Sequence, residues 1–99
     1  MRIINPDVFI EAKLRFNARA QQKQIDRIWT ILRDRCFSNS HELRGVFPTA
    51  ERFPGASNTY RFDIGGRKGL RMVAVIRFRN GSVFIHMIGD HDDYDRFSL

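Results

Sequence analysis

Cysteine is almost absent from this chain of 99 residues, and no long apolar run occurs in it. Cys36 is the only cysteine, so an intramolecular disulfide and a cysteine-rich zinc module are excluded. No stretch reaches the roughly 18 consecutive apolar residues that a membrane-spanning helix needs. The opening residues MRIINPDVF meet a proline early and lack the apolar core of a secretory signal. We therefore expect a cytoplasmic protein.

Lysine is also scarce, although the chain is basic. Seventeen basic and 11 acidic residues give a formal net charge of +6, and all but three of the basic residues are arginine. Residues 90–99 carry a net charge of −3, which leaves +9 on residues 1–89. Because the arginine guanidinium binds phosphate through paired hydrogen bonds and stacks on bases, this composition favours a polyanionic partner. The alternative is a soluble basic domain whose arginines form surface ion pairs.

The first half of the chain is expected to be mainly helical. Residues 1–5 predict a short strand, and Asn5-Pro6 resembles the start of a helix that runs to about residue 16. A second helix is predicted over about residues 19–35, because its apolar residues recur at the spacing of one buried face. Cys36 ends this apolar stripe and is expected to be packed rather than reactive. Residues 37–58 are predicted to form an irregular connection with one helical turn at residues 41–44.

After residue 58 the apolar residues alternate with a period of two, which predicts three strands. Asn80-Gly81 predicts a tight hairpin between the last two, with both central residues at positive φ. In the last strand, Val83, Ile85 and Met87 alternate with Phe84, His86 and Ile88. The chain contains no repeat or linker, so we expect one domain over residues 1–99. Its predicted fold is α+β, with the order β-α-α-β-β-β and two N-terminal helices packed on one face of an antiparallel sheet.

The long middle strand predicts a basic open face on this sheet. Side chains of one parity share a face, which groups Arg71, Arg77 and Arg79 opposite the apolar residues of the strand. Val73 and Val75 lie between these arginines and provide apolar floor for unpaired bases. Three further basic residues extend the predicted RNA-binding surface: Arg61, Arg67 and Lys68. The alternative is that the arginines only keep a one-sided sheet soluble.

The acidic end of the chain is its densest cluster of reactive side chains. His91 and Tyr94 are three residues apart, so a helical turn would place both on one side. The alternative is a solvated acidic turn in which Tyr94 and Phe97 fix the tail to the core. A histidine beside three aspartates has none of the spacing of a known metal loop, so we expect neither a metal nor a cofactor.

Four segments of the chain resemble the HigB-type toxins of bacterial type II toxin–antitoxin systems, within the wider RelE-like group. They are ELRGVFPTAERF at residues 42–53, YRFDIGG at residues 60–66, LRMVAV at residues 70–75 and IGDHDDYD at residues 88–95. The resemblance implies a small ribonuclease that cleaves messenger RNA on the translating ribosome. It also implies a cognate HigA-like antitoxin with a helix-turn-helix, through which the toxin reaches operator DNA only indirectly.

The family pattern carries over at Arg71, at His91 and at Tyr94. The resemblance implies that His91 is the general acid or base, that Tyr94 orients or protonates the RNA, and that Arg71 binds the reacting phosphate without a metal. The family's Gly-Gly-Asn is replaced here by Gly-Gly-Arg-Lys-Gly, which puts Lys68 forward as a further catalytic cation. Two alternatives stay open: a non-catalytic module that binds RNA or an acidic protein segment, and a DNA-binding regulator.

Overall fold

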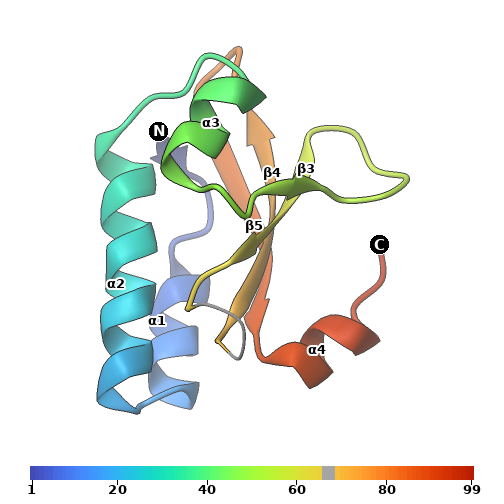
Figure 1. Ribbon diagram of the computed structural model, residues 1–99. Helices are drawn as coiled ribbons and strands as arrows, with labels where there is room; N and C mark the ends of the chain where they lie inside the picture. The colour runs from blue at the N-terminus through green and yellow to red at the C-terminus, as the bar shows by residue number, and fades with distance from the viewer. Residues whose placement is uncertain (66–68) are drawn as a thin grey trace.

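The computed structural model describes residues 1–65 and 69–99, and Figure 1 shows its elements. The helices are α1 (Asp7–Arg15), α2 (Arg19–Asp34), α3 (Ser40–Val46) and α4 (His91–Arg96). The strands are β1 (Arg2–Ile3), β2 (Glu51–Arg52), β3 (Thr59–Asp63), β4 (Arg71–Arg77) and β5 (Ser82–Gly89). Within the described ranges, no helix is both long and apolar enough to cross a membrane.

The described strands form one sheet in the order β1-β5-β4-β3-β2. β1 runs parallel to β5, and the other neighbours are antiparallel. In Figure 1, α1 and α2 lie on one side of the sheet and α4 lies on the other. The α+β class and the two N-terminal helices on one face are therefore confirmed. The predicted order omitted α3, β2 and α4, which are short, and the parallel β1 makes the sheet mixed rather than purely antiparallel.

The core lies between the sheet and the two N-terminal helices. The apolar side chains on one face of each helix pack against the side chains on one face of the sheet, where every second residue of a strand points. The fully buried side chains include Phe9, Ile25, Leu32, Phe62, Met72 and Ile76. Each large apolar side chain buried in this way stabilises the fold by about 1.5–3 kcal/mol. Trp29 is only partly buried, and its ring packs against Phe9 with centroids 4.9 Å apart. The predicted buried face of α2 is confirmed at Ile25, Ile28 and Leu32.

The alternation predicted for the last strand is wrong at its C-terminal end. Ala74 pairs with Ile85 and Val73 pairs with Met87, so β5 carries one extra residue, His86. A β-bulge of this kind reverses the faces of the residues that follow it. Ile88 is consequently part of the core, and Met87 is not.

The hairpin between β4 and β5 is wider than predicted. Arg77 pairs with Ser82, and the Gly81 N–H donates to the Arg77 carbonyl at 2.9 Å, which leaves a four-residue loop. Gly81 has φ +67°, but Asn80 does not have a positive φ, so the predicted two-residue turn is wrong. Arg79 consequently lies in the loop and not on the strand face with Arg71.

Asn5 and Cys36 also differ from expectation. The Asn5 side chain does not cap α1 but continues the pairing of β1 with β5: its amide donates to the Ile85 carbonyl and accepts from the Ile85 N–H, both at 2.8 Å. Cys36 is exposed beyond the end of α2, because the helix ends at Asp34 before the apolar stripe reaches it.

Candidate active site

Two arginines and a tyrosine converge on the sheet face that α1 and α2 leave open. Arg61 of β3 and Arg71 of β4 project from this face, and Tyr94 of α4 lies over it. The guanidinium carbon of Arg71 lies 4.9 Å from the centre of the Tyr94 ring, and that of Arg61 lies 5.8 Å from it. Both distances fall in the range of a cation–π contact. Three residues predicted from the sequence therefore meet, although Arg61 and Tyr94 are 33 positions apart in the chain.

Two carboxylates orient these guanidinium groups. An Arg61 amino group donates to the exposed Glu51 carboxylate at 2.7 Å. Arg71 Nε lies 3.4 Å from Asp63 Oδ1, which is long for a hydrogen bond. Within the described part of the chain, the Nε atoms of both arginines are buried without a hydrogen-bond partner. An anion that bound here would meet two guanidinium groups held close to one aromatic ring.

The charge of Arg61 is secure in this position. Burial alone would lower its pKa, but the contact with the Tyr94 side chain and the charge of Glu51 outweigh burial, and the pKa is raised above its usual value. The guanidinium therefore stays protonated at every pH at which the protein works.

A network around Asp93 caps α4 and links it to α1. The Asp90 side chain accepts from the Asp93 N–H at 2.9 Å, and the Asp93 carboxylate accepts from the Asp90 N–H at 2.9 Å, which forms a capping box. Arg15 at the end of α1 lies 2.9 Å from the Asp93 carboxylate. This hydrogen bond from Arg15, reinforced by the Asp90 N–H, holds the pKa of Asp93 below its usual value. The network fixes the start of α4 against α1, and Tyr94 is the residue that follows Asp93 in this helix.

A side chain at Gly89 would collide with this network. A β-carbon built there would lie 2.6 Å from both Cβ and Oδ2 of Asp93. Glycine at this position is therefore required by the close approach of α4 to the end of β5.

The remaining predicted residues that the structure describes make no hydrogen bond or cation–π contact with the two arginines or the Tyr94 ring. His91 is the first residue of α4, on the same helix as Tyr94, and among the described residues its side chain makes no hydrogen bond. Arg77 lies at the other end of β4, roughly 20 Å from Arg71 at about 3.3 Å per residue. Arg67 and Lys68 lie outside the described residues, so the structure does not place them.

Sequence reasoning missed the residues that support the site. Asp63 is the cross-strand partner of Arg71, and Arg15 reaches Asp93 from a helix 78 positions away. The alternation of β3 could have indicated Asp63, because it shares the parity of Arg61. No sequence signal marks the contact of Arg15, which depends on where α1 ends relative to α4.

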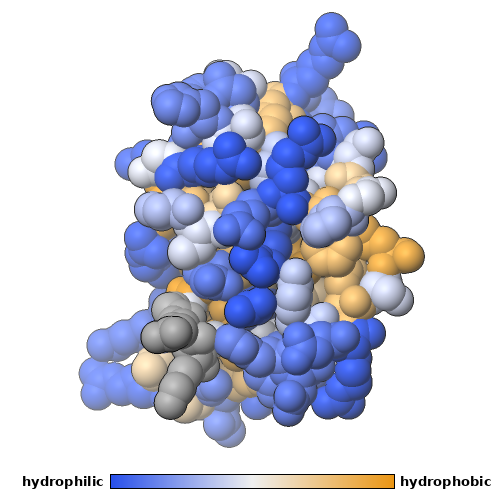
Figure 2. Space-filling view, turned by 45° about the vertical axis from the view of Figure 1, so that its right-hand side comes forward, coloured by the Kyte–Doolittle hydropathy of each residue, from blue (hydrophilic) through white to orange (hydrophobic). Residues whose placement is uncertain are grey.

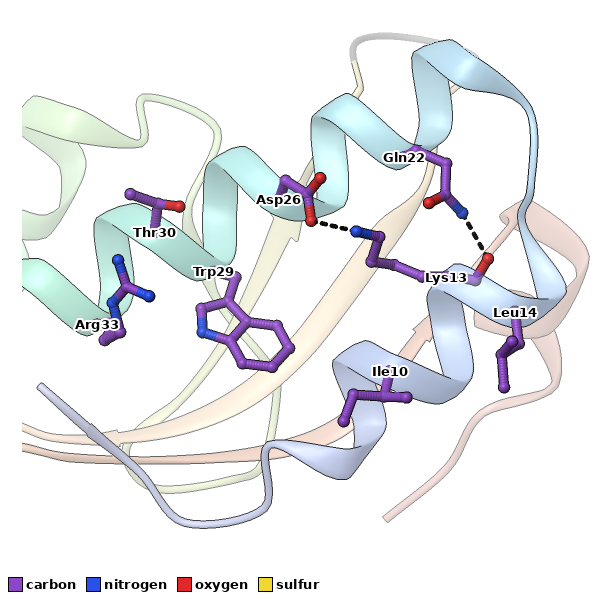
Figure 3. Close-up of a pocket in the computed structure, with 8 residues that line it drawn as sticks. All are labelled: Ile10, Lys13, Leu14, Gln22, Asp26, Trp29, Thr30 and Arg33. Atoms are coloured by element: carbon purple, nitrogen blue, oxygen red, sulfur yellow. Dashed lines mark hydrogen bonds and ion pairs between the residues drawn. The ribbon is translucent and has the colours of Figure 1, made fainter.

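A groove between α1 and α2 lies on the solvent side of these two helices and has a different character. It has a volume of about 590 Å³, and Figure 3 shows Trp29 projecting from α2 and Ile10 and Leu14 from α1. Ile10 is 52% exposed and Leu14 is 76% exposed. Lys13 at its edge pairs with Asp26 at 2.6 Å, so this cation is already neutralised. The groove is suited to apolar side chains of a protein partner, not to phosphate.

The site on the open face can bind a phosphodiester and stabilise added negative charge on it. Two fixed guanidinium groups supply the charge, and a phenol and an imidazole on α4 supply groups that can carry protons. In the described part of the chain, no three side chains of His, Cys, Asp or Glu are grouped so that they could hold a metal ion.

The sequence matches the HigB toxin family, described as the RelE-like toxic component of a toxin–antitoxin system, over residues 21–97. The chain belongs to this family. It is 31% identical over 71 residues to an mRNA interferase HigB of Escherichia coli O6:H1, a match that covers 72% of this chain and 68% of the relative. It is 32% identical over 62 residues to an mRNA interferase HigB of Shigella flexneri, which covers 63% of this chain and 59% of the relative. The family resemblance inferred from the sequence is confirmed.

Proposed function

We propose that this protein is a metal-independent endoribonuclease that cleaves messenger RNA and so inhibits translation. The observation that carries the proposal is the convergence of Arg61 and Arg71 on the Tyr94 ring. Membership of the toxin family and the mRNA interferase names of its relatives support messenger RNA as the substrate.

The reaction is an internal transfer at phosphorus. The 2′-oxygen of one nucleotide forms a bond to the adjacent phosphorus, and the bond from phosphorus to the 5′-oxygen of the next nucleotide breaks. The products are a 2′,3′-cyclic phosphate and a 5′-hydroxyl end. Arg71, with Arg61 beside it, stabilises the charge that accumulates on the phosphate oxygens. His91 and Tyr94 carry the proton away from the 2′-oxygen and to the 5′-oxygen, and Lys68, which lies outside the described residues, is expected to add a cation.

The ribosome and an antitoxin complete the proposed system. We expect cleavage on translating ribosomes, and neutralisation by a HigA-like helix-turn-helix antitoxin that also carries the toxin to operator DNA. The groove between α1 and α2 supports a protein partner, because Ile10 and Leu14 are exposed there. Arg77, and Arg79 from its loop, extend contact with the RNA backbone along β4.

Primer extension on cellular mRNA after a brief pulse of expression tests the proposal. New 5′ ends inside translated frames are expected with the native chain and not with the Arg71→Ala, His91→Ala double variant. Soluble native protein that generates no new ends would contradict cleavage and favour a non-catalytic RNA-binding module.

A further inference from the structure

A row of aromatic rings continues from the candidate active site across the open sheet face. The ring centres of Phe84 and His86 lie 5.2 Å apart, and those of His86 and Phe97 lie 5.9 Å apart. Phe97 and Phe53 follow at 5.7 Å, and Phe53 reaches Tyr94 at 6.4 Å. We call Phe53, Phe84, His86 and Phe97 the aromatic row. It connects to Arg71 through Tyr94.

The β-bulge of β5 explains why His86 belongs to this row. Phe84 pairs with Val75 on the open face, and the extra residue in β5 is His86. The bulge lets His86 contact Phe84 and the Phe97 ring while Ile88 still enters the core. Bulges often redirect a side chain next to a functional site.

The rings of the aromatic row are more exposed to solvent than the aromatic rings of the core. Phe9 and Phe62 are 0% exposed, whereas Phe84 is 40% exposed and the other three rings are half-buried. Figure 2 views the molecule turned toward this side and shows blue, polar side chains running down the middle with an orange, apolar patch beside them. An apolar aromatic surface beside cations is the combination that binds unpaired nucleotides, because rings stack on bases while cations bind phosphates.

We propose that the aromatic row binds a nucleobase of the single-stranded RNA that extends from the phosphate held by Arg61 and Arg71, and so influences which bases lie near the cut, with Phe84 at the end of the row far from Tyr94. This inference rests on the proposed ribonuclease function. A polyanion is favoured over an apolar peptide as the occupant, because the row is continuous, through Tyr94, with the guanidinium groups of Arg61 and Arg71.

Fluorescence anisotropy with a labelled, fully 2′-O-methylated RNA oligonucleotide tests this site, since the probe binds without being cleaved. Phe84→Ala is expected to weaken binding by about 5- to 100-fold, the loss typical for removing one stacking partner. Phe84→Trp, which keeps a ring, should bind like the native chain. Ile31→Ala is the matched control: it removes a half-buried apolar side chain from α2, on the other face, and should leave binding unchanged.

A probe with one base removed makes the test specific for stacking. When the missing base is the one that stacks on the row, the native chain should bind the abasic probe as weakly as Phe84→Ala binds the intact probe. Phe84→Ala should bind the abasic probe and the intact probe equally. As a second readout, cleavage ends mapped in cells should show changed flanking bases for Phe84→Ala, whereas Arg71→Ala should give no ends.

The outcomes separate this inference from the proposed function. Equal RNA binding by Phe84→Ala and the native chain, with Arg71→Ala still weakened, would overturn the aromatic row and leave the phosphate site intact. Unchanged RNA binding together with lost antitoxin binding by Phe84→Ala would assign the row to a protein partner and also overturn it. A native chain that neither bound the probe nor cleaved mRNA in cells would overturn both proposals.

Discussion

Tyr94 has two separable roles at the residue scale. Its ring contacts the guanidinium groups of Arg61 and Arg71, and its hydroxyl is the group proposed to carry a proton. The contacts with the arginines need only the aromatic ring, whereas proton transfer needs the hydroxyl. One substitution can therefore remove the hydroxyl and keep the ring contacts.

Tyr94→Phe should lower the cleavage rate by about 100-fold or more, the usual contribution of a positioned general acid or base. The thermal midpoint should change little, because the ring contacts remain. Cleavage of ribosome-bound mRNA and a melting curve measure the two effects. A variant with the native rate would show that the phenol serves only to pack and to orient the arginines.

Asp93 makes the attachment of α4 sensitive to acid. Its pKa is held below the usual value by the hydrogen bond from Arg15. A carboxylate with a lowered folded-state pKa adds stability above its unfolded pKa of about 4, and that stability is lost as the pH falls through the folded pKa.

Asp93→Asn should therefore lower the free energy of unfolding at neutral pH. The decrease of this free energy below about pH 4 should be smaller in the variant than in the native chain. Urea unfolding of the native chain and the variant at a series of pH values gives the comparison. Asp26→Asn removes a more exposed carboxylate, 56% exposed, and serves as the control. Parallel pH curves for the native chain and Asp93→Asn would contradict the role of this contact.

At the scale of the element, α4 depends on the glycine that precedes its capping box. Gly89→Ala should push Asp93 away and weaken the capping box, at a cost of about 1–3 kcal/mol. Cleavage should fall with stability, because α4 carries Tyr94. Urea unfolding and the cleavage assay measure both.

Gly45→Ala provides the matched control within α3. A β-carbon there would meet nothing within 4 Å, and alanine is favoured over glycine in a helix by about 1 kcal/mol. This control should leave stability unchanged or raise it. Gly89→Ala as stable as the native chain would show that α4 tolerates a side chain at this close approach.

The elements also show what the sequence could and could not predict. The helix face of Ile25 and Leu32 and the alternation of β3 and β4 were predicted, because side-chain period reports which face is buried. The bulge at His86 and the four-residue loop that contains Arg79 were not. Both depend on how two strands register with each other, which the period within one strand does not encode.

The candidate site was predicted only in part, because the sequence does not encode contacts between distant elements. Arg61, Arg71 and Tyr94 were identified from strand parity and family resemblance, and the structure brings them together. Asp63, Arg15 and Asp93 were missed as supporting residues, because their contacts join elements far apart in the sequence.

At the scale of the whole molecule, the two faces of the sheet divide the proposed tasks. The open face carries the arginines and Tyr94, and the helices that cover the other face carry the groove with Ile10 and Leu14 (Figures 1 and 3). A protein partner bound in the groove would not need to touch the candidate active site.

Leu14→Glu should therefore stay toxic but resist neutralisation by the antitoxin. Leu14 is 76% exposed, so folding should be unaffected, whereas a carboxylate in an apolar contact should weaken antitoxin binding by about 10-fold or more. Growth on co-expression and a binding titration measure this. Lys23→Glu places a carboxylate on α2 outside the groove as control. Normal neutralisation of Leu14→Glu would place the antitoxin elsewhere.

Cleavage is proposed to take place where Arg61, Arg71 and Tyr94 converge, and not along the whole basic strand. Arg71 and Arg77 allow a direct test, because they are the same residue type on the same face of β4, at its opposite ends. The decisive measurement is the single-turnover cleavage rate of ribosome-bound mRNA by Arg71→Ala and Arg77→Ala. Arg71→Ala should lower the cleavage rate by about 100-fold or more, and Arg77→Ala should lower it only several-fold. Equal losses for the two variants would contradict the account.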